Sequence, residues 1–199
     1  MEENLNPQAE LPQAKPMMPF WTAVKTCFKK YFDFKGRARR SEYWWFSLFG
    51  AILYFVWGLL IAFIVVPMGF EAATGSDVVT DPTPLFMFLL AVITWLPLLF
   101  IIIPLYAALT RRLHDSGHSG WWVVASLVLT IIYYALHYYF VDQYVLSDLG
   151  SSGVASHQSL GMLLLLTLPN LVIGIIILIF SIQDSEKHEN RFGPSPKYQ

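Results

Sequence analysis

The chain has 199 residues, of which 55% are hydrophobic, 16% aromatic and only 14% charged. Soluble domains usually carry about 25% charged residues, so this deficit and the mean hydropathy of +0.50 argue against a soluble domain and predict a membrane protein. The single cysteine, Cys27, excludes an internal disulfide and a metal site built from cysteines. We expect no cleavable signal peptide, because residues 1–42 are polar and basic and the first apolar run is too long for one.

The N-terminal region divides into a polar tail and an amphipathic segment. Residues 1–19 are rich in Pro, Gln and Glu and too poor in apolar residues to pack, so we expect a disordered tail. In residues 20–32, apolar and aromatic side chains recur at helical spacing with lysines on the other side. This pattern predicts a basic amphipathic helix lying in the membrane interface. The alternative is a helix packed on the protein's own cytoplasmic face.

Four apolar segments are long enough to cross a bilayer, which requires about 20 residues. None of them contains Asp, Glu, Lys or Arg, and they cover approximately residues 43–66, 85–109, 121–141 and 160–182. With the amphipathic helix, they predict an all-α, polytopic membrane protein. Its membrane domain comprises residues 20–182, and residues 183–199 form a polar C-terminal tail.

The basic residues predict the orientation of these spans. Lys and Arg number eight in residues 1–42, two in residues 110–120 and three in residues 183–199, which accounts for all 13. Every basic residue therefore falls on one side of a four-span zigzag. By the positive-inside rule that side is cytoplasmic, so we expect both termini and the central loop to be cytoplasmic.

The central loop, 111–122, contains two arginines, two histidines and an aspartate. His114 and His118 are four residues apart, a spacing that can chelate a metal on a continuous helix. Ser116 and Gly117 argue against such a helix, and a bound ion usually needs three or four ligands, so we predict no metal or other cofactor. The basic residues can instead complement the negative end of span two, with Asp115, Ser116 or Ser119 capping span three. Binding of a ligand or partner is the remaining interpretation.

A second basic cluster precedes the first span. Seven basic residues fall within 16 positions, opposed only by Asp33: Lys25, Lys29, Lys30, Lys35, Arg37, Arg39 and Arg40. Juxtamembrane basic residues gain about 1 kcal/mol each from anionic lipid, so we expect contact with anionic lipid here. Alternatively, these residues only set the topology. No nucleic-acid-binding signature accompanies them, so nucleic acid is not an expected partner.

Prolines occur in the middle of two spans. Pro97 and the pair Pro169-Asn170 predict helix breaks in spans two and four. Interrupted helices at corresponding positions are typical of transporter sites, although membrane helices also tolerate proline. A transporter or channel subunit is therefore the alternative function.

Three segments, 34–45, 111–122 and 190–196, together resemble a bacterial inner-membrane family, domain of unknown function 805, the YhaH-like proteins. The resemblance implies a small inner-membrane protein and leaves its activity open. The family pattern does not fix His118, which argues further against a paired-histidine metal site. Residues 184–188 read Asp-Ser-Glu-Lys-His where related sequences tend to have a Gly/Thr-rich turn. The resemblance therefore does not imply that the C-terminal tail docks in the manner of the family.

All three motifs are predicted to be cytoplasmic, and we hypothesise that they form one polar cluster, because paired charges gain most in a partly dry network. Its members are Arg37, Arg40, Glu42, Arg111, Arg112, His114, Asp115 and Arg191. We expect a non-enzymatic protein that binds a partner protein, or an anionic ligand or lipid, at this cluster, and homo-oligomers are possible. No nucleophile-base arrangement predicts an enzyme. Cys27 is expected to be a labelling site reactive only from the cytoplasmic side.

Overall fold

The computed structural model describes residues 13–74, 84–140 and 157–198. The chain forms the helices α1 (Phe20–Lys29), α2 (Arg40–Thr74), α3 (Pro84–Asp115), α4 (Trp121–Phe140) and α6 (His157–Ile182). Four of them contain a segment long and apolar enough to cross a membrane: Arg40–Phe63, Val92–Asp115, Trp121–Phe140 and Leu164–Ile182. The predicted all-α, polytopic architecture is confirmed.

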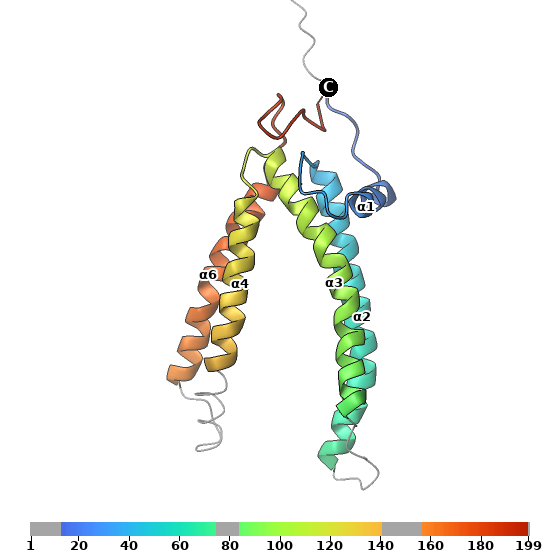
Figure 1. The fold of residues 1–199 in the computed structure, drawn as a ribbon, viewed down its shortest axis with the longest axis vertical. Helices are drawn as coiled ribbons and strands as arrows, with labels where there is room; N and C mark the ends of the chain where they lie inside the picture. The colour runs from blue at the N-terminus through green and yellow to red at the C-terminus, as the bar shows by residue number, and fades with distance from the viewer. Residues whose placement is uncertain (1–12, 75–83, 141–156, 199) are drawn as a thin grey trace, which may run out of the picture.

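The helices form an inverted V (Figure 1). α2 runs beside α3 and α4 runs beside α6, and the two pairs diverge from a common apex. We call the polar segments gathered at this apex, together with the helix ends that they contact, the head, which comprises residues 13–42, 111–120 and 183–198. Most buried side chains of the described residues lie in the head or the adjoining helix ends. Apolar side chains along the spans remain exposed because lipid, rather than a protein core, is their expected surrounding.

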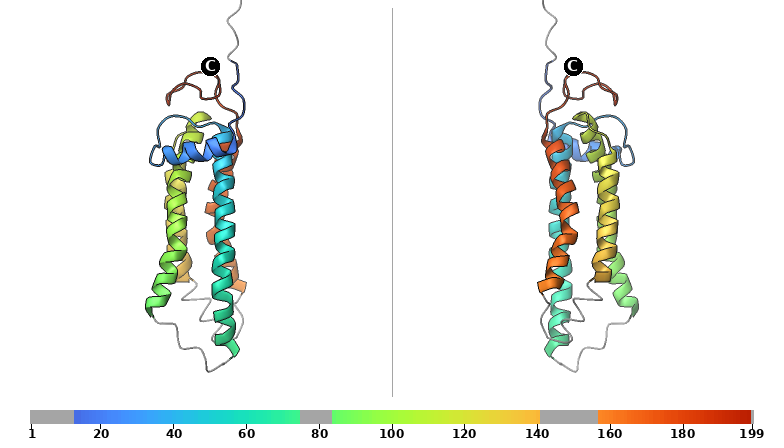
Figure 2. Two further views of the ribbon diagram at one scale, coloured as in Figure 1. Left: turned by 90° about the vertical axis from the view of Figure 1, so that its right-hand side faces the viewer. Right: turned by 90° about the vertical axis from the view of Figure 1, so that its left-hand side faces the viewer.

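α1 lies across the spans at the apex (Figure 2). Its buried side chains are Ala23, Val24 and Cys27, and the last two pack with Phe46 of α2 and Ala108 of α3. The predicted amphipathic helix is therefore present, and part of its apolar face covers the protein's own helices, as the alternative interpretation expected. α1 is oriented across the spans, as a helix that lies in the membrane interface must be.

The turn between α3 and α4 is built by local hydrogen bonds. Gly117 has a φ of +79°, and its N–H donates to the carbonyl of His114 while His118 N–H donates to the carbonyl of Leu113. This is a Schellman motif, which favours glycine at the left-handed position. The hydroxyl of Ser119 then accepts from the Trp121 N–H at 3.3 Å and caps α4. Ser119 is therefore the capping residue among the three considered.

Two expectations about the spans differ from the structure. α3 continues past residue 109 to Asp115, because residues 110–116 contain no glycine or proline. The predicted breaks at Pro97 and Pro169 are wrong, since both prolines lie inside continuous helices. A proline removes one N–H donor, and the rest of the helical ladder continues around it.

The described part of the N-terminal tail, residues 13–19, contacts the C-terminal segment and the residues just before α2. Residues 13–19 lie outside the helices, and Lys15 N–H donates to the carbonyl of Lys197 at 2.8 Å. The guanidinium of Arg39 donates to the carbonyls of Lys15 and Pro16. Hydrogen bonds to its own backbone groups, rather than packing of apolar side chains, hold this segment in place. The expected disorder of residues 1–12 falls outside the described residues, as do residues 75–83 and 141–156. Residues 67–74, which follow the predicted first span, continue α2.

A buried ion-paired cluster as the candidate functional site

Asp115, the last residue of α3, is the centre of a buried cluster in the head. Its Oδ1 accepts from Arg37 Nε at 2.9 Å, and its Oδ2 accepts from Arg112 Nη1 and from the Ser185 hydroxyl. The side chains of Arg37, Arg112 and Asp115 are at most 1% exposed. A carboxylate this dry is stable because charged partners replace its lost hydration. Arg112 and Asp115 share a face of the last helical turn, which local geometry favours.

Arg37 ties the loop before α2 to the C-terminal segment. Besides the Asp115 carboxylate, its guanidinium donates to four backbone carbonyls at 2.6–3.3 Å, those of Asp115, Glu186, His188 and Gly193. These five hydrogen bonds equal the number of N–H donors that a guanidinium has. Arg37 therefore has no donor to offer an external ligand without breaking a contact of the fold.

A second buried ion pair joins three helices. Arg111 Nη2 lies 3.1 Å from Glu42 Oε1, and their side chains are 0% and 4% exposed. Arg111 Nη1 also donates to the carbonyls of Lys30 and Asp33 beyond the end of α1. Glu42 lies in the first turn of α2, where the positive end of the helix dipole favours a carboxylate. The pair thus fixes α1, α2 and α3 to one another.

Arg112 connects the two helix pairs at the apex. Its Nε donates to the carbonyl of Ser181 at 3.0 Å, and its Nη2 donates to the carbonyl of Gln183. The last carbonyls of a helix have no partner within that helix. By filling this role at the end of α6, Arg112 joins α6 to α3.

The two histidines of the central loop have separate surroundings. His114 Nδ1 lies 3.1 Å from the carbonyl oxygen of Gly36, and its ring stacks on Phe192 with centroids 3.8 Å apart. His118 instead stacks on Phe180, with centroids 3.6 Å apart. Within the described residues, no group of three or more His, Cys, Asp or Glu side chains is placed to hold a metal ion.

Two predicted members lie at the outer rim of the head. Arg40 forms an ion pair of 2.8 Å with Asp184, with side chains 43% and 49% exposed. Burial acts to raise the pKa of Asp184, but hydrogen bonds from Lys197 and the Ser185 N–H, together with the charge of Arg40, lower it to about 2. Arg191 is exposed, and its guanidinium carbon lies 4.7 Å from the centroid of the Phe192 ring.

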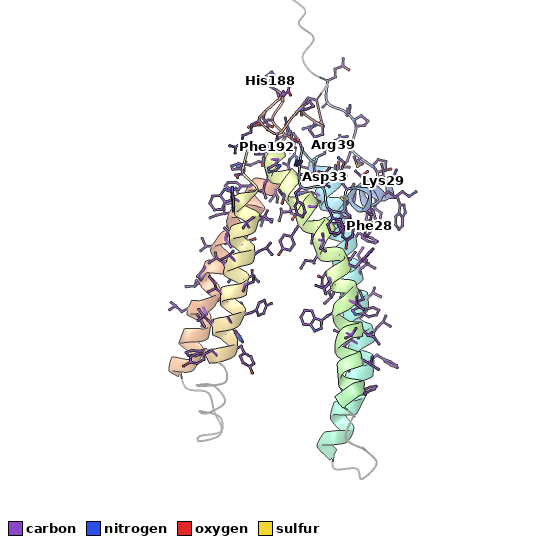
Figure 3. All side chains as sticks on the ribbon, in the orientation of Figure 1. Phe28, Lys29, Asp33, Arg39, His188 and Phe192 are labelled. Carbon is purple, nitrogen blue, oxygen red and sulfur yellow. The ribbon has the colours of Figure 1, made fainter. Side chains whose placement is uncertain are left out.

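The eight predicted residues therefore gather at the apex in two groups. Arg40 and Arg191 are accessible, whereas His114 and the ion-paired side chains are buried: Arg37, Glu42, Arg111, Arg112 and Asp115. Sequence reasoning placed Arg191 in the cluster but missed the role of residues 184–188 of the C-terminal segment, whose Phe192 and His188 lie at the apex (Figure 3). Its docking is visible in the hydrogen bond from Glu186 N–H to the Asp115 carbonyl, 3.0 Å long. The unusual residues 184–188 thus supply the backbone carbonyls and the Ser185 hydroxyl that the cluster uses.

Cys27 does not suit its expected use as a labelling site. Its side chain is buried, and burial and the nearby charge of Glu42 raise the pKa of the thiol from 9.0 to about 12. The reactive form is the thiolate. The folded protein therefore protects Cys27 from labelling on either side of a membrane.

The fold and the cluster define a helical multi-pass membrane protein whose central turn and C-terminal segment are locked together by buried ion pairs. A family model described as a protein of unknown function (DUF805) matches residues 31–194, and the chain belongs to this family. The chain is 29% identical to the inner membrane protein YhaH of Escherichia coli K12, over 86% of this chain and 93% of YhaH. It is 35% identical to the inner membrane protein YhaI of the same organism, over 58% of this chain and 79% of YhaI. No solved structure matches the chain. The relatives and the four candidate spans support a multi-pass protein of the bacterial inner membrane.

Proposed function

We propose that the protein is a non-enzymatic binding protein of the inner membrane whose cytoplasmic head contacts anionic lipid head groups through α1. The supporting observation is an exposed stripe along α1. Trp21, Lys25 and Lys29 follow one another at intervals of four residues and are all exposed. The stripe lies apart from the buried side chains Ala23, Val24 and Cys27.

The buried ion pairs have a positioning role in this proposal. The donors of Arg37 are all used, and Arg111 and Arg112 are wholly buried. An anionic ligand would have to break these pairs before it could bind, which is costly for buried charges. Of the arginine and carboxylate side chains in the predicted cluster, only Arg40 and Arg191 are exposed.

The position of α1 suits contact with a membrane surface. It lies across the spans at their apex (Figure 2), and its side chains pack against residues 42–49 of α2 and 100–108 of α3. This places α1 beside about the first three turns of α2 and the last four turns of α3. Tryptophan is enriched at the membrane interface, and each lysine near an anionic surface contributes about 1 kcal/mol.

The proposal is tested by the lipid preference of the purified protein. Phosphatidylglycerol and phosphatidylcholine are titrated separately into the detergent-solubilised protein, and bound lipids are counted by native mass spectrometry. We expect a preference for phosphatidylglycerol that falls roughly thirtyfold in the double variant Lys25→Gln, Lys29→Gln, because two contributions of about 1 kcal/mol are lost.

Lys187→Gln is the matched control, because Lys187 is also exposed but lies on the C-terminal segment. It should retain the wild-type preference. Equal binding of both lipids by the wild type, or an unchanged preference in the double variant, would refute the role of α1. The transporter alternative receives no support from α3 and α6, because both helices continue through their prolines.

A further inference from the structure

A cavity of about 600 Å³ lies between α3 and α4, below the turn that joins them. Its upper end is lined by His114, Ser119 and Gly120, and its lower walls include Ile102 and Leu127. Ile102 precedes His114 by twelve residues, so the cavity extends roughly 18 Å along α3 away from the head. The cavity thus has a polar end at the head and an apolar end among the spans.

The polar end has unused hydrogen-bonding groups but no charge. None of the described residues that line the cavity is Asp, Glu, Lys or Arg. The carbonyl oxygen of Gly36 can only accept, so Nδ1 of His114 carries a hydrogen and Nε2 is the acceptor of the neutral ring. The Ser119 hydroxyl accepts from the Trp121 N–H, which leaves its own hydrogen free to donate.

The polar end is held in place by contacts outside the cavity. The His114 ring is clamped by the Gly36 carbonyl and by face-to-face stacking on Phe192, with an interplanar angle of 6°. Gly120 has no side chain, so the space beside the His114 ring stays open. A Cβ at position 120 would lie 3.1 Å from His114 Nε2 and 2.8 Å from Thr110 Cγ2. A side chain at position 120 would therefore occupy the polar end itself.

We propose that this cavity binds a lipid alcohol, an uncharged amphiphile with a free hydroxyl head group. The hydroxyl donates to His114 Nε2 and accepts from the Ser119 hydroxyl, so both unused groups gain a partner. The chains lie against the apolar side chains of α3 and α4. Val124 and Leu127 are 43% and 38% exposed, so the cavity is open on the side from which lipid enters. A phospholipid head group is disfavoured because none of the described residues that line the cavity is Lys or Arg, so its phosphate would have no cation within the cavity.

The proposal is tested with paired lipids that differ in the hydroxyl group. Dioleoylglycerol is compared with trioleoylglycerol, and geranylgeraniol with its methyl ether, by native mass spectrometry of the full chain in detergent. We expect each alcohol to bind more tightly than its capped partner. A preference between the two alcohols identifies the source, a glycerolipid or a prenyl alcohol. Equal binding of alcohols and capped lipids, or no binding of either alcohol, would overturn the proposal.

Two variants locate the binding site. Val124→Phe fills the cavity from an exposed position, and we expect it to weaken alcohol binding at least tenfold. Val128→Phe is the matched control, because Val128 is 49% exposed on the same helix and does not line the cavity.

Ser119→Ala removes the hydrogen-bond donor of the cavity and should weaken alcohol binding about fivefold without changing binding of the capped lipids. Protection of Cys27 from maleimide verifies that each variant is folded. Equal weakening by Val124→Phe and Val128→Phe would place the lipid elsewhere.

Discussion

Arg37 and Asp115, 78 residues apart in the sequence, form an ion pair of 2.9 Å in which neither side chain is more than 1% exposed. The pair closes the head, because Arg37 also binds three carbonyls of the C-terminal segment. Burial of both charges makes the contact costly to disrupt from one side. The apex therefore depends on a small number of long-range polar contacts.

Removal of the central carboxylate should destabilise the fold severely. Asp115→Asn keeps the size of the side chain but leaves Arg37 and Arg112 without their buried counter-ion, and we expect a loss of about 3–5 kcal/mol in the free energy of unfolding. Denaturant unfolding in micelles measures it. Asp184→Asn is the control, because Asp184 and its partner Arg40 are about half exposed, so solvent screens the lost contacts and the loss should be clearly smaller than that of Asp115→Asn. Similar losses in the two variants would contradict the central role of Asp115.

Cys27 should make the stability of the protein depend on alkaline pH. The thiol has a pKa of about 12 in the folded state and 9.0 ordinarily, so the folded state holds its proton more tightly. This contribution to stability is fully present below pH 9.0 and is lost as the pH rises towards 12. Unfolding measured over that range should show the decline, and Cys27→Ala should reduce it. At pH 7 maleimide should label Cys27 only after unfolding, so rapid labelling of the folded protein would refute its burial.

Arg37→Lys should loosen the C-terminal segment while leaving the charge in place. Lysine has three donors where arginine has five, so at least two of the five hydrogen bonds are lost. We expect amide hydrogen exchange at residues 186–193 to accelerate at least tenfold, because each bond to a charged donor contributes about 1.5–3 kcal/mol. Arg191→Lys, at an exposed position of the same segment, should leave the exchange rates nearly unchanged. Protection that persists in Arg37→Lys would mean that other contacts hold the segment.

The turn between α3 and α4 should tolerate no side chain at its glycine. Gly117→Ala places an L-residue at a φ of +79°, and its Cβ would approach the Glu186 carboxylate. We expect a loss of about 1–2 kcal/mol in thermal or denaturant unfolding. Gly174→Ala is the contrasting change, because Gly174 lies inside α6 with open space around it. That substitution should be neutral or stabilising by up to about 1 kcal/mol, and a loss equal to that of Gly117→Ala would argue against backbone strain as the cause.

The predicted orientation needs a labelling site other than Cys27. Lys187→Cys in a Cys27→Ala background places a single thiol at an exposed position of the C-terminal segment. Because the basic residues favour a cytoplasmic head, an impermeant maleimide should label this variant in inverted inner-membrane vesicles but not in intact spheroplasts. The reverse pattern would overturn the predicted orientation.

Composition and hydropathy predicted the membrane class and the four spans, because long uncharged apolar runs have few stable alternatives to helices in lipid. The end of α3 was predicted too early, near residue 109, although Gly117 is the residue whose left-handed turn closes that helix. The pairing of the charged side chains could not be predicted, because it depends on how the helix ends are arranged in space. Arg37 and Arg112 share Asp115, whereas Arg40 turns outward to Asp184. In the sequence these arginines cannot be told apart, because each is a basic residue next to a predicted span. Which carboxylate each arginine binds depends on which helix ends meet. The surroundings of the two histidines could not be predicted from the sequence either. His114 stacks on Phe192 and His118 stacks on Phe180, and both aromatic rings are distant in the sequence.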